Sequence, residues 1–60
     1  MIIVTKINDS EIVINSELIE IMQETPDTTI TLTTGRKLIV KESVDDIIDK
    51  IKIYKQSLLK

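Results

Sequence analysis

The sequence predicts a small α+β domain, in which an antiparallel β meander of about five strands is followed by one C-terminal amphipathic helix packed on it. Through residue 41, short runs of Ile, Val and Thr alternate with clusters of turn-forming residues, as strands and hairpins do. From residue 44 onward, apolar residues instead recur at steps of three and four, the spacing of a helix that packs on one side. A length of 60 residues provides for a single domain, residues 1–60.

The first hairpin is predicted at the start of the chain. Residues 1–7 form an apolar run rich in Ile and Val, which is typical of a strand covered on both faces. A turn should follow at Asn8, Asp9 and Ser10, because their short polar side chains bond nearby backbone groups and Asn and Asp tolerate a positive φ. A second strand is expected over residues 11–14.

Residues 15–25 fit two structures. A helix is possible because Asn15 or Ser16 could cap it and apolar residues follow at helical spacing. A strand is also possible, because side chains alternate over residues 18–23 and the segment ends at a Thr-Pro-Asp turn, residues 25–27. The strand is the preferred interpretation, since a short helix would interrupt an otherwise continuous antiparallel pattern.

The second hairpin is the most clearly marked. Residues 28–33 place Thr29, Thr31 and Thr33 on one face and Ile30 and Leu32 on the other. Gly35 suits the tight turn that follows, because glycine accepts a positive φ. The returning strand is expected over residues 37–41.

A helix is predicted to begin at Ser43, whose hydroxyl can cap it, with Asp46 at the third helical position in a near capping box. Its predicted apolar stripe, which packs on the sheet, consists of Val44, Ile47, Ile48, Ile51, Tyr54 and Leu58. Ile53 falls on the opposite side. Charges complement the helix dipole, with carboxylates early and lysines late: Asp45, Asp46, Asp49, Lys50, Lys52, Lys55 and Lys60.

Catalysis is not expected of this composition. The chain has no histidine and no cysteine, so its serines lack a base and the usual soft metal ligands are missing. The spacing of Asp45, Asp46 and Asp49 fits no EF-hand loop. The carboxylates are interpreted as solvated surface and helix-dipole complement, so we expect no enzyme activity, no cofactor and no metal site.

Charge and hydropathy restrict the partner and the compartment. A net charge of −2 and a pI near 4.9, with Tyr54 as the single aromatic residue, make nucleic acid an unexpected ligand. Neither a signal peptide nor a stretch of about 20 apolar residues is visible in the sequence, so a cytoplasmic protein without a transmembrane segment is expected.

More apolar side chains are present than one sheet face and one helix stripe can cover. The surplus consists of Ile2, Val4, Val13, Ile39 and Ile53. Two explanations remain open: the sheet closes into a small barrel that buries both faces, or the surplus forms a patch that a second subunit or another protein covers. A homo-oligomer would also be one ordinary way for a chain this short to gain stability.

Three stretches carry a family pattern: INDSEIVIN (residues 7–15), LIEIMQETPDTTITLTTGRKLIVKES (18–43) and VDDIIDKI (44–51). The most specific portion consists of Leu18-Ile19-Glu20, Thr25-Pro26-Asp27-Thr28, Ile30-Thr31-Leu32, Gly35, Lys37 and Glu42-Ser43. With these residues the chain resembles the small flagellar FlbD/SwrD family of bacterial motility proteins, which is distinct from the larger transcription regulator that shares the first name. The family usually has a glycine in the turn before Glu11, where this chain has Asp9-Ser10.

The resemblance implies a non-enzymatic cytoplasmic protein that supports full swimming or swarming, peripheral at the flagellar base. It implies flagellar motor or stator components as partners, and it supplies no catalytic residue or cofactor. The candidate interaction residues are the motif members expected to be exposed, together with one surplus apolar residue: Glu20, Thr25, Asp27, Thr28, Lys37 and Ile53. The alternative is a small nucleic-acid-binding regulator of the Sm-like or translational-regulator type, because compact five-stranded proteins ending in a helix often take that role.

Overall fold

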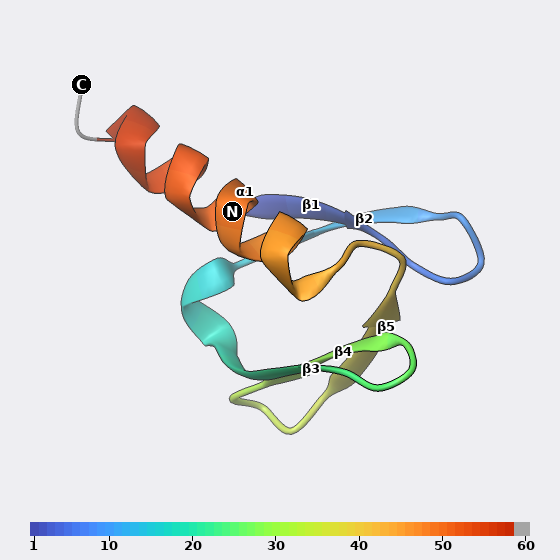
Figure 1. The fold of residues 1–60 in the computed structure, drawn as a ribbon. Helices are drawn as coiled ribbons and strands as arrows, with labels where there is room; N and C mark the ends of the chain where they lie inside the picture. Colours follow the sequence, from blue (N-terminus) through green and yellow to red (C-terminus); the bar gives the residue numbers. More distant parts are fainter. Residues whose placement is uncertain (59–60) are drawn as a thin grey trace.

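Five antiparallel strands in two sheets and one C-terminal helix make up residues 1–58, the part of the chain that the computed structural model describes (Figure 1). The elements in chain order are β1 (Ile2–Thr5), β2 (Glu11–Ile14), the 3₁₀ turn η1 (Ser16–Leu18), β3 (Ile19–Glu24), β4 (Thr28–Leu32), β5 (Lys37–Val40) and α1 (Val44–Leu58). The predicted α+β class is confirmed. Lys60, counted above among the late lysines of the helix, lies outside the described residues.

Strands β1 and β2 form a two-stranded sheet whose turn has the predicted chemistry. The Asn8 Oδ1 accepts hydrogen bonds from the Ser10 N–H at 3.1 Å and the Ser10 hydroxyl at 2.6 Å, while Asp9 adopts a φ of 71°. Strand β1 ends at Thr5, so Ile7 belongs to the turn region and not to the strand predicted over residues 1–7. In the register of the pair, Ile3 lies opposite Val13.

The ambiguous segment contains both predicted structures. The Asn15 Oδ1 accepts a hydrogen bond from the Glu17 N–H at 3.0 Å and so caps the 3₁₀ turn η1, after which β3 runs as a strand. This turn redirects the chain, so β2 pairs with β1 only and β3 pairs with β4 only. The expected five-stranded meander is therefore divided into two sheets.

The second sheet has the order β3-β4-β5, with β4 in the centre. Gly35 has a φ of +93°, and its N–H donates to the Leu32 carbonyl at 2.9 Å, which confirms the predicted tight turn. At the other end, the Thr25–Pro26 peptide bond in the turn between β3 and β4 is cis.

The two sheets meet along one line and do not close into a barrel. An isolated bridge joins Lys6 to Val40, and the Lys41 N–H donates to the Thr5 carbonyl at 2.8 Å. The Glu42 carboxylate accepts the Thr5 N–H with both oxygens at 2.9 Å. The barrel alternative raised by the apolar surplus is therefore wrong, because β2 and β3 do not pair.

Helix α1 begins as predicted. The Ser43 Oγ accepts the Asp46 N–H at 3.1 Å, and the Glu24 carboxylate of β3 accepts the Val44 N–H at 3.0 Å. The buried part of the stripe is narrower than predicted: Ile47 is fully buried, but Ile48 and Leu58 are exposed. The C-terminal part of the helix extends beyond the strands (Figure 1).

The core lies where α1 and the inner faces of both sheets meet. Its buried residues are Ile2, Val4, Ile14, Ile30, Leu38, Val40 and Ile47. Ile2 and Val4 were predicted to be surplus, and this prediction is wrong, because the helix and the second sheet cover the inner face of β1 and leave these side chains 4% and 0% exposed.

Candidate interaction surface

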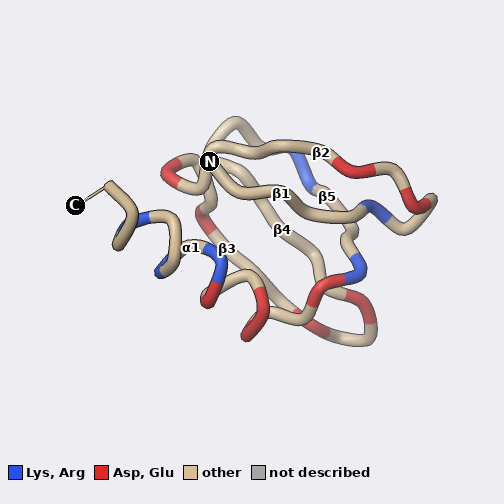
Figure 2. Tube along the Cα trace, turned by 90° about the horizontal axis from the view of Figure 1, so that it is seen from above, with Lys and Arg blue, Asp and Glu red and all other residues tan. Residues whose placement is uncertain are grey.

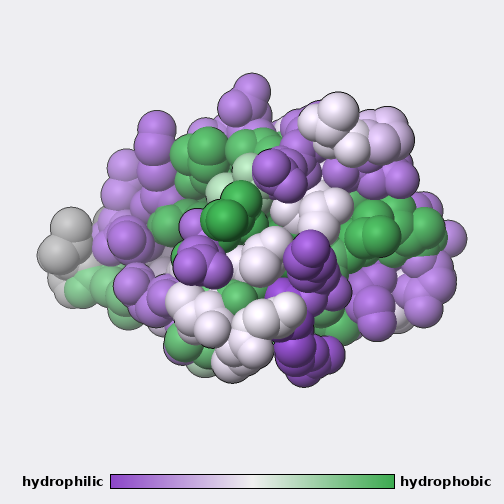
Figure 3. All heavy atoms as spheres, turned by 90° about the horizontal axis from the view of Figure 1, so that it is seen from below, coloured by the Kyte–Doolittle hydropathy of each residue, from purple (hydrophilic) through white to green (hydrophobic). Residues whose placement is uncertain are grey.

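Many large apolar side chains remain on the surface. Those that are exposed among residues 1–58 are Met1, Ile3, Ile7, Val13, Leu18, Ile21, Ile39, Ile48, Ile53 and Leu58. Figure 3 shows one face of the molecule, on which the apolar residues form separate patches between polar ones. Val13, Ile39 and Ile53 are thus uncovered, as predicted for the surplus, at 63%, 49% and 66% exposure. This amount of apolar surface favours contact with another molecule.

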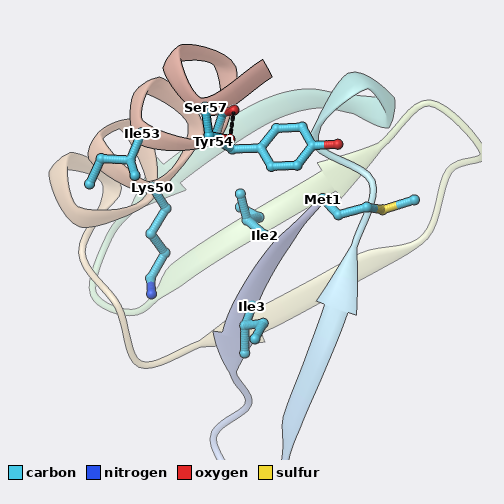
Figure 4. A pocket seen from close by; sticks show the side chains of 7 residues that line it. All are labelled: Met1, Ile2, Ile3, Lys50, Ile53, Tyr54 and Ser57. Atoms are coloured by element: carbon cyan, nitrogen blue, oxygen red, sulfur yellow. Dashed lines mark hydrogen bonds between the residues drawn. The ribbon is translucent and has the colours of Figure 1, made fainter. Parts of the chain in front are cut away.

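One groove lies between β1 and α1; we call it the helix groove. It has a volume of about 390 Å³ and is lined by Met1, Ile2, Ile3, Lys50, Ile53, Tyr54 and Ser57 (Figure 4). Ile2 faces the core and Ile3 faces the opposite way, so the groove is lined from both faces of β1. A groove of this kind follows the edge of a strand, and the helix forms its other wall.

Hydrogen bonds divide this edge of β1 into two halves. At Thr5 the edge is closed, because the N–H binds the Glu42 carboxylate and the carbonyl binds the Lys41 N–H. The backbone groups of alternate residues point to the same side of a strand, so those of Ile3 share the direction of those of Thr5 and point away from β2. No hydrogen bond from another described residue reaches them. We call Met1 and Ile3 the open half of the edge and Thr5 the closed half.

A second groove of about 600 Å³, the β5 groove, runs beside β5. It is lined by Lys6, Ile7, Asn8, Asp27, Arg36, Lys37, Leu38 and Ile39. Its three cations and one carboxylate give a charge of +2, whereas the whole chain carries −2. Two of the predicted interaction residues, Asp27 and Lys37, come together here. A further groove of about 320 Å³ lies between β2 and the second sheet, where the two sheets fail to close.

Acidic and basic residues separate along the helix. Figure 2 shows acidic residues over its first turns and basic residues farther on.

Burial opposes ionisation of the Glu42 carboxyl, but the Thr5 hydrogen bonds and the charge of Lys50 outweigh it, so the pKa of Glu42 lies below its ordinary value of 4.5. Glu42 is therefore held ionised at neutral pH as part of the closed half. The ion pairs among the described residues, Lys41 with Asp9 and Lys55 with Glu17, are exposed.

Two further properties bear on chemistry. Among residues 1–58, no three carboxylates lie close enough to hold a metal ion. No helix in the same part of the chain is long and apolar enough to span a membrane.

A comparison with protein-family models supplies the family. The model named FlbD, described as flagellar and swarming motility proteins, matches residues 1–59. The chain belongs to the FlbD family. It is accordingly a flagellar and swarming motility protein, as its resemblance implied. The comparisons with curated proteins and with solved structures found no significant match.

The structure distributes the FlbD motif residues over different surfaces. Glu20 is exposed at the register shift between Ile19 and Ile21, and Thr25 is exposed in the turn after β3; neither lines one of the three grooves described above. The prediction that Thr28 is exposed is wrong, because it belongs to the central strand β4, faces inward beside Ile30 and is 4% exposed.

Ile53 is exposed and lines the helix groove. Two other candidate interaction residues, Asp27 and Lys37, line the β5 groove. The motif residues of this FlbD protein therefore do not form one site.

Sequence reasoning missed the open half of β1. An apolar run was interpreted as a strand covered on both faces, but Met1 and Ile3 are 52% and 51% exposed. Ile2 and Ile3 are the same residue type on opposite faces of β1, so no local pattern distinguishes the covered face from the exposed one.

Proposed function

We propose that this FlbD-family protein is a non-enzymatic accessory of the flagellum that raises motor power by binding a motor or stator protein. The observation that carries the proposal is the exposed apolar surface on β1 and on α1, including Ile3 and Ile53. Surface of this kind on a small domain is typical of a binding protein. The proposed location is the cytoplasm, at the flagellar base.

Composition supports a protein partner over catalysis and over nucleic acid. The chain has no histidine or cysteine for acid–base or nucleophilic chemistry, and its net charge is −2. An apolar surface with few charges is instead suited to the desolvated centre of a protein interface.

Deleting the gene in its native bacterium tests the proposal. We expect flagellar filaments to assemble in normal number while swimming and swarming decrease. The torque of single motors at high load should fall, and a plasmid copy should restore it. Unchanged torque in the deletion strain, or loss of the filaments themselves, would contradict the proposal.

A further inference from the structure

We infer that the open half of the β1 edge is a docking site for an extended segment of a protein partner, one that carries apolar side chains and a carboxylate. The inference rests on the proposed function and specifies the chemistry of the partner. It starts from the unpaired backbone groups of Ile3, which point away from β2 into the helix groove.

A strand edge with free N–H and C=O groups is complementary to another extended backbone. The edge is free at Met1 and Ile3 and closed two residues later, where Glu42 and Lys41 occupy Thr5. An added strand would therefore pair over a short length, and its side chains must contribute the remaining affinity. This geometry indicates an extended segment of which only two or three residues pair with β1.

The walls of the helix groove define those side chains. Met1, Ile3 and Ile53 are each more than half exposed, and they line the groove together with Tyr54 (Figure 4). Side chains of an added strand alternate between its two faces, so apolar residues on one face would reach Ile3 and those on the other face would reach Ile53 and the Tyr54 ring.

Charge complementarity adds the carboxylate. Lys50 is the one charged side chain that lines the helix groove; its charge also acts on the Glu42 carboxylate, but neither ion pair of residues 1–58 includes it. An Asp or Glu beside the paired residues of the partner would meet this ammonium group, whereas a Lys or Arg would be repelled.

A second copy of the chain fits the edge less well. The β1 strand of another copy would bring β2 and α1 with it. These elements would compete for space with helix α1, which already stands beside the open half as the wall of a groove of about 390 Å³. Symmetric pairing would also bring two Lys50 side chains to one interface. A single extended segment avoids both problems.

The test uses peptides of random sequence displayed on phage, selected on the full-length protein. The selected peptides, made synthetically, are then measured by fluorescence polarisation against the wild type and three variants. Ile3→Pro removes the open N–H. Proline is tolerated at strand edges where the N–H makes no bond within the sheet. Val13→Pro is the matched control, because Val13 lies opposite Ile3 and its N–H points to the other edge of the same sheet.

We expect the selected peptides to be acidic and rich in β-branched residues. Their affinity should fall about tenfold or more in Ile3→Pro and change less than about twofold in Val13→Pro. The Ile3 amide should exchange with solvent about tenfold more slowly in the complex. Ile53→Asp, which leaves the backbone intact, should weaken peptide binding by a similar factor. It provides the test of the docking site if Ile3→Pro fails to fold.

Three results would overturn the inference. They are the absence of any selected peptide, binding that persists in both Ile3→Pro and Ile53→Asp, and an Ile3 amide that gains no protection. Sedimentation of the wild type adds a fourth, a dimer that Ile3→Pro dissociates, because the edge would then hold a second copy. If deletion of the gene lowers torque but no peptide binds the edge, the motility function stands and only this docking site falls.

Discussion

The two halves of the β1 edge differ although they are two residues apart. The closed half, Thr5, is held by a carboxylate and a backbone N–H that arrive from the end of β5, and it joins the two sheets. The open half, Met1 and Ile3, has free backbone groups beside exposed apolar side chains. One strand can thus stabilise the fold with one part of its edge and leave the other part free for a partner.

The largest expected effect contrasts adjacent isoleucines of β1. Ile2 is 4% exposed and Ile3 is 51% exposed. Ile2→Ala should lower the free energy of unfolding by about 3 kcal/mol, because it leaves a cavity in the core. Ile3→Ala should lower it by less than about 1 kcal/mol. Urea unfolding followed by circular dichroism measures both.

Since a chain of this length has only about 3–9 kcal/mol of stability, Ile2→Ala should lower the urea midpoint far more than Ile3→Ala does. Equal losses in the two variants would mean that Ile3 is covered and that the edge is not open.

A smaller effect is expected at the closed half. Glu42→Gln exchanges a carboxylate acceptor for a neutral amide and should cost about 1 kcal/mol, a value reduced because the site is partly exposed to water. The folded-state pKa of Glu42 is lowered, so its contribution is complete above the ordinary value of 4.5 and is lost as the pH falls through the folded value.

Thermal unfolding from pH 7 to pH 3 should therefore show a weaker acid dependence in Glu42→Gln than in the wild type. Glu20→Gln is the matched control, because Glu20 is exposed on β3 and accepts no hydrogen bond from the described residues. Identical pH profiles for the wild type and Glu42→Gln would show that this carboxylate does not help to close the edge.

The smallest effect concerns the exposed ion pair near the closed half. Asp9→Asn removes the partner of Lys41 but keeps a residue that tolerates the positive φ of this turn. We expect a change below about 0.5 kcal/mol, because both side chains are solvated. A loss as large as that of Glu42→Gln, measured by urea unfolding with and without added salt, would show that charge pairing and not the Thr5 hydrogen bonds closes the edge.

Local chemistry was readable from the sequence. The Ser43 cap, the Gly35 turn and the turn at Asn8 and Asp9 each depend on a few neighbouring residues, and each is present as predicted. The inward direction of Thr28 was also readable, because the alternation that directs Ile30 into the core applies equally two residues earlier.

The features that depend on distant residues were not readable. The division into two sheets follows from how η1 directs the chain, and the closure of the edge depends on Glu42 reaching Thr5 across 37 positions. No local pattern encodes either contact. The open half of β1 is what these two long-range arrangements leave uncovered, so the candidate docking site could be located only once the fold was known.

Single-motor torque shows whether the open half of β1 acts in motility. The deletion strain would carry the wild type, Ile3→Pro or Val13→Pro at matched protein levels, and single-motor torque would be recorded at high load. We expect Val13→Pro to restore torque and Ile3→Pro to leave it close to the deletion level. Full torque with Ile3→Pro would contradict the claim that this protein supports the motor through the open half of β1.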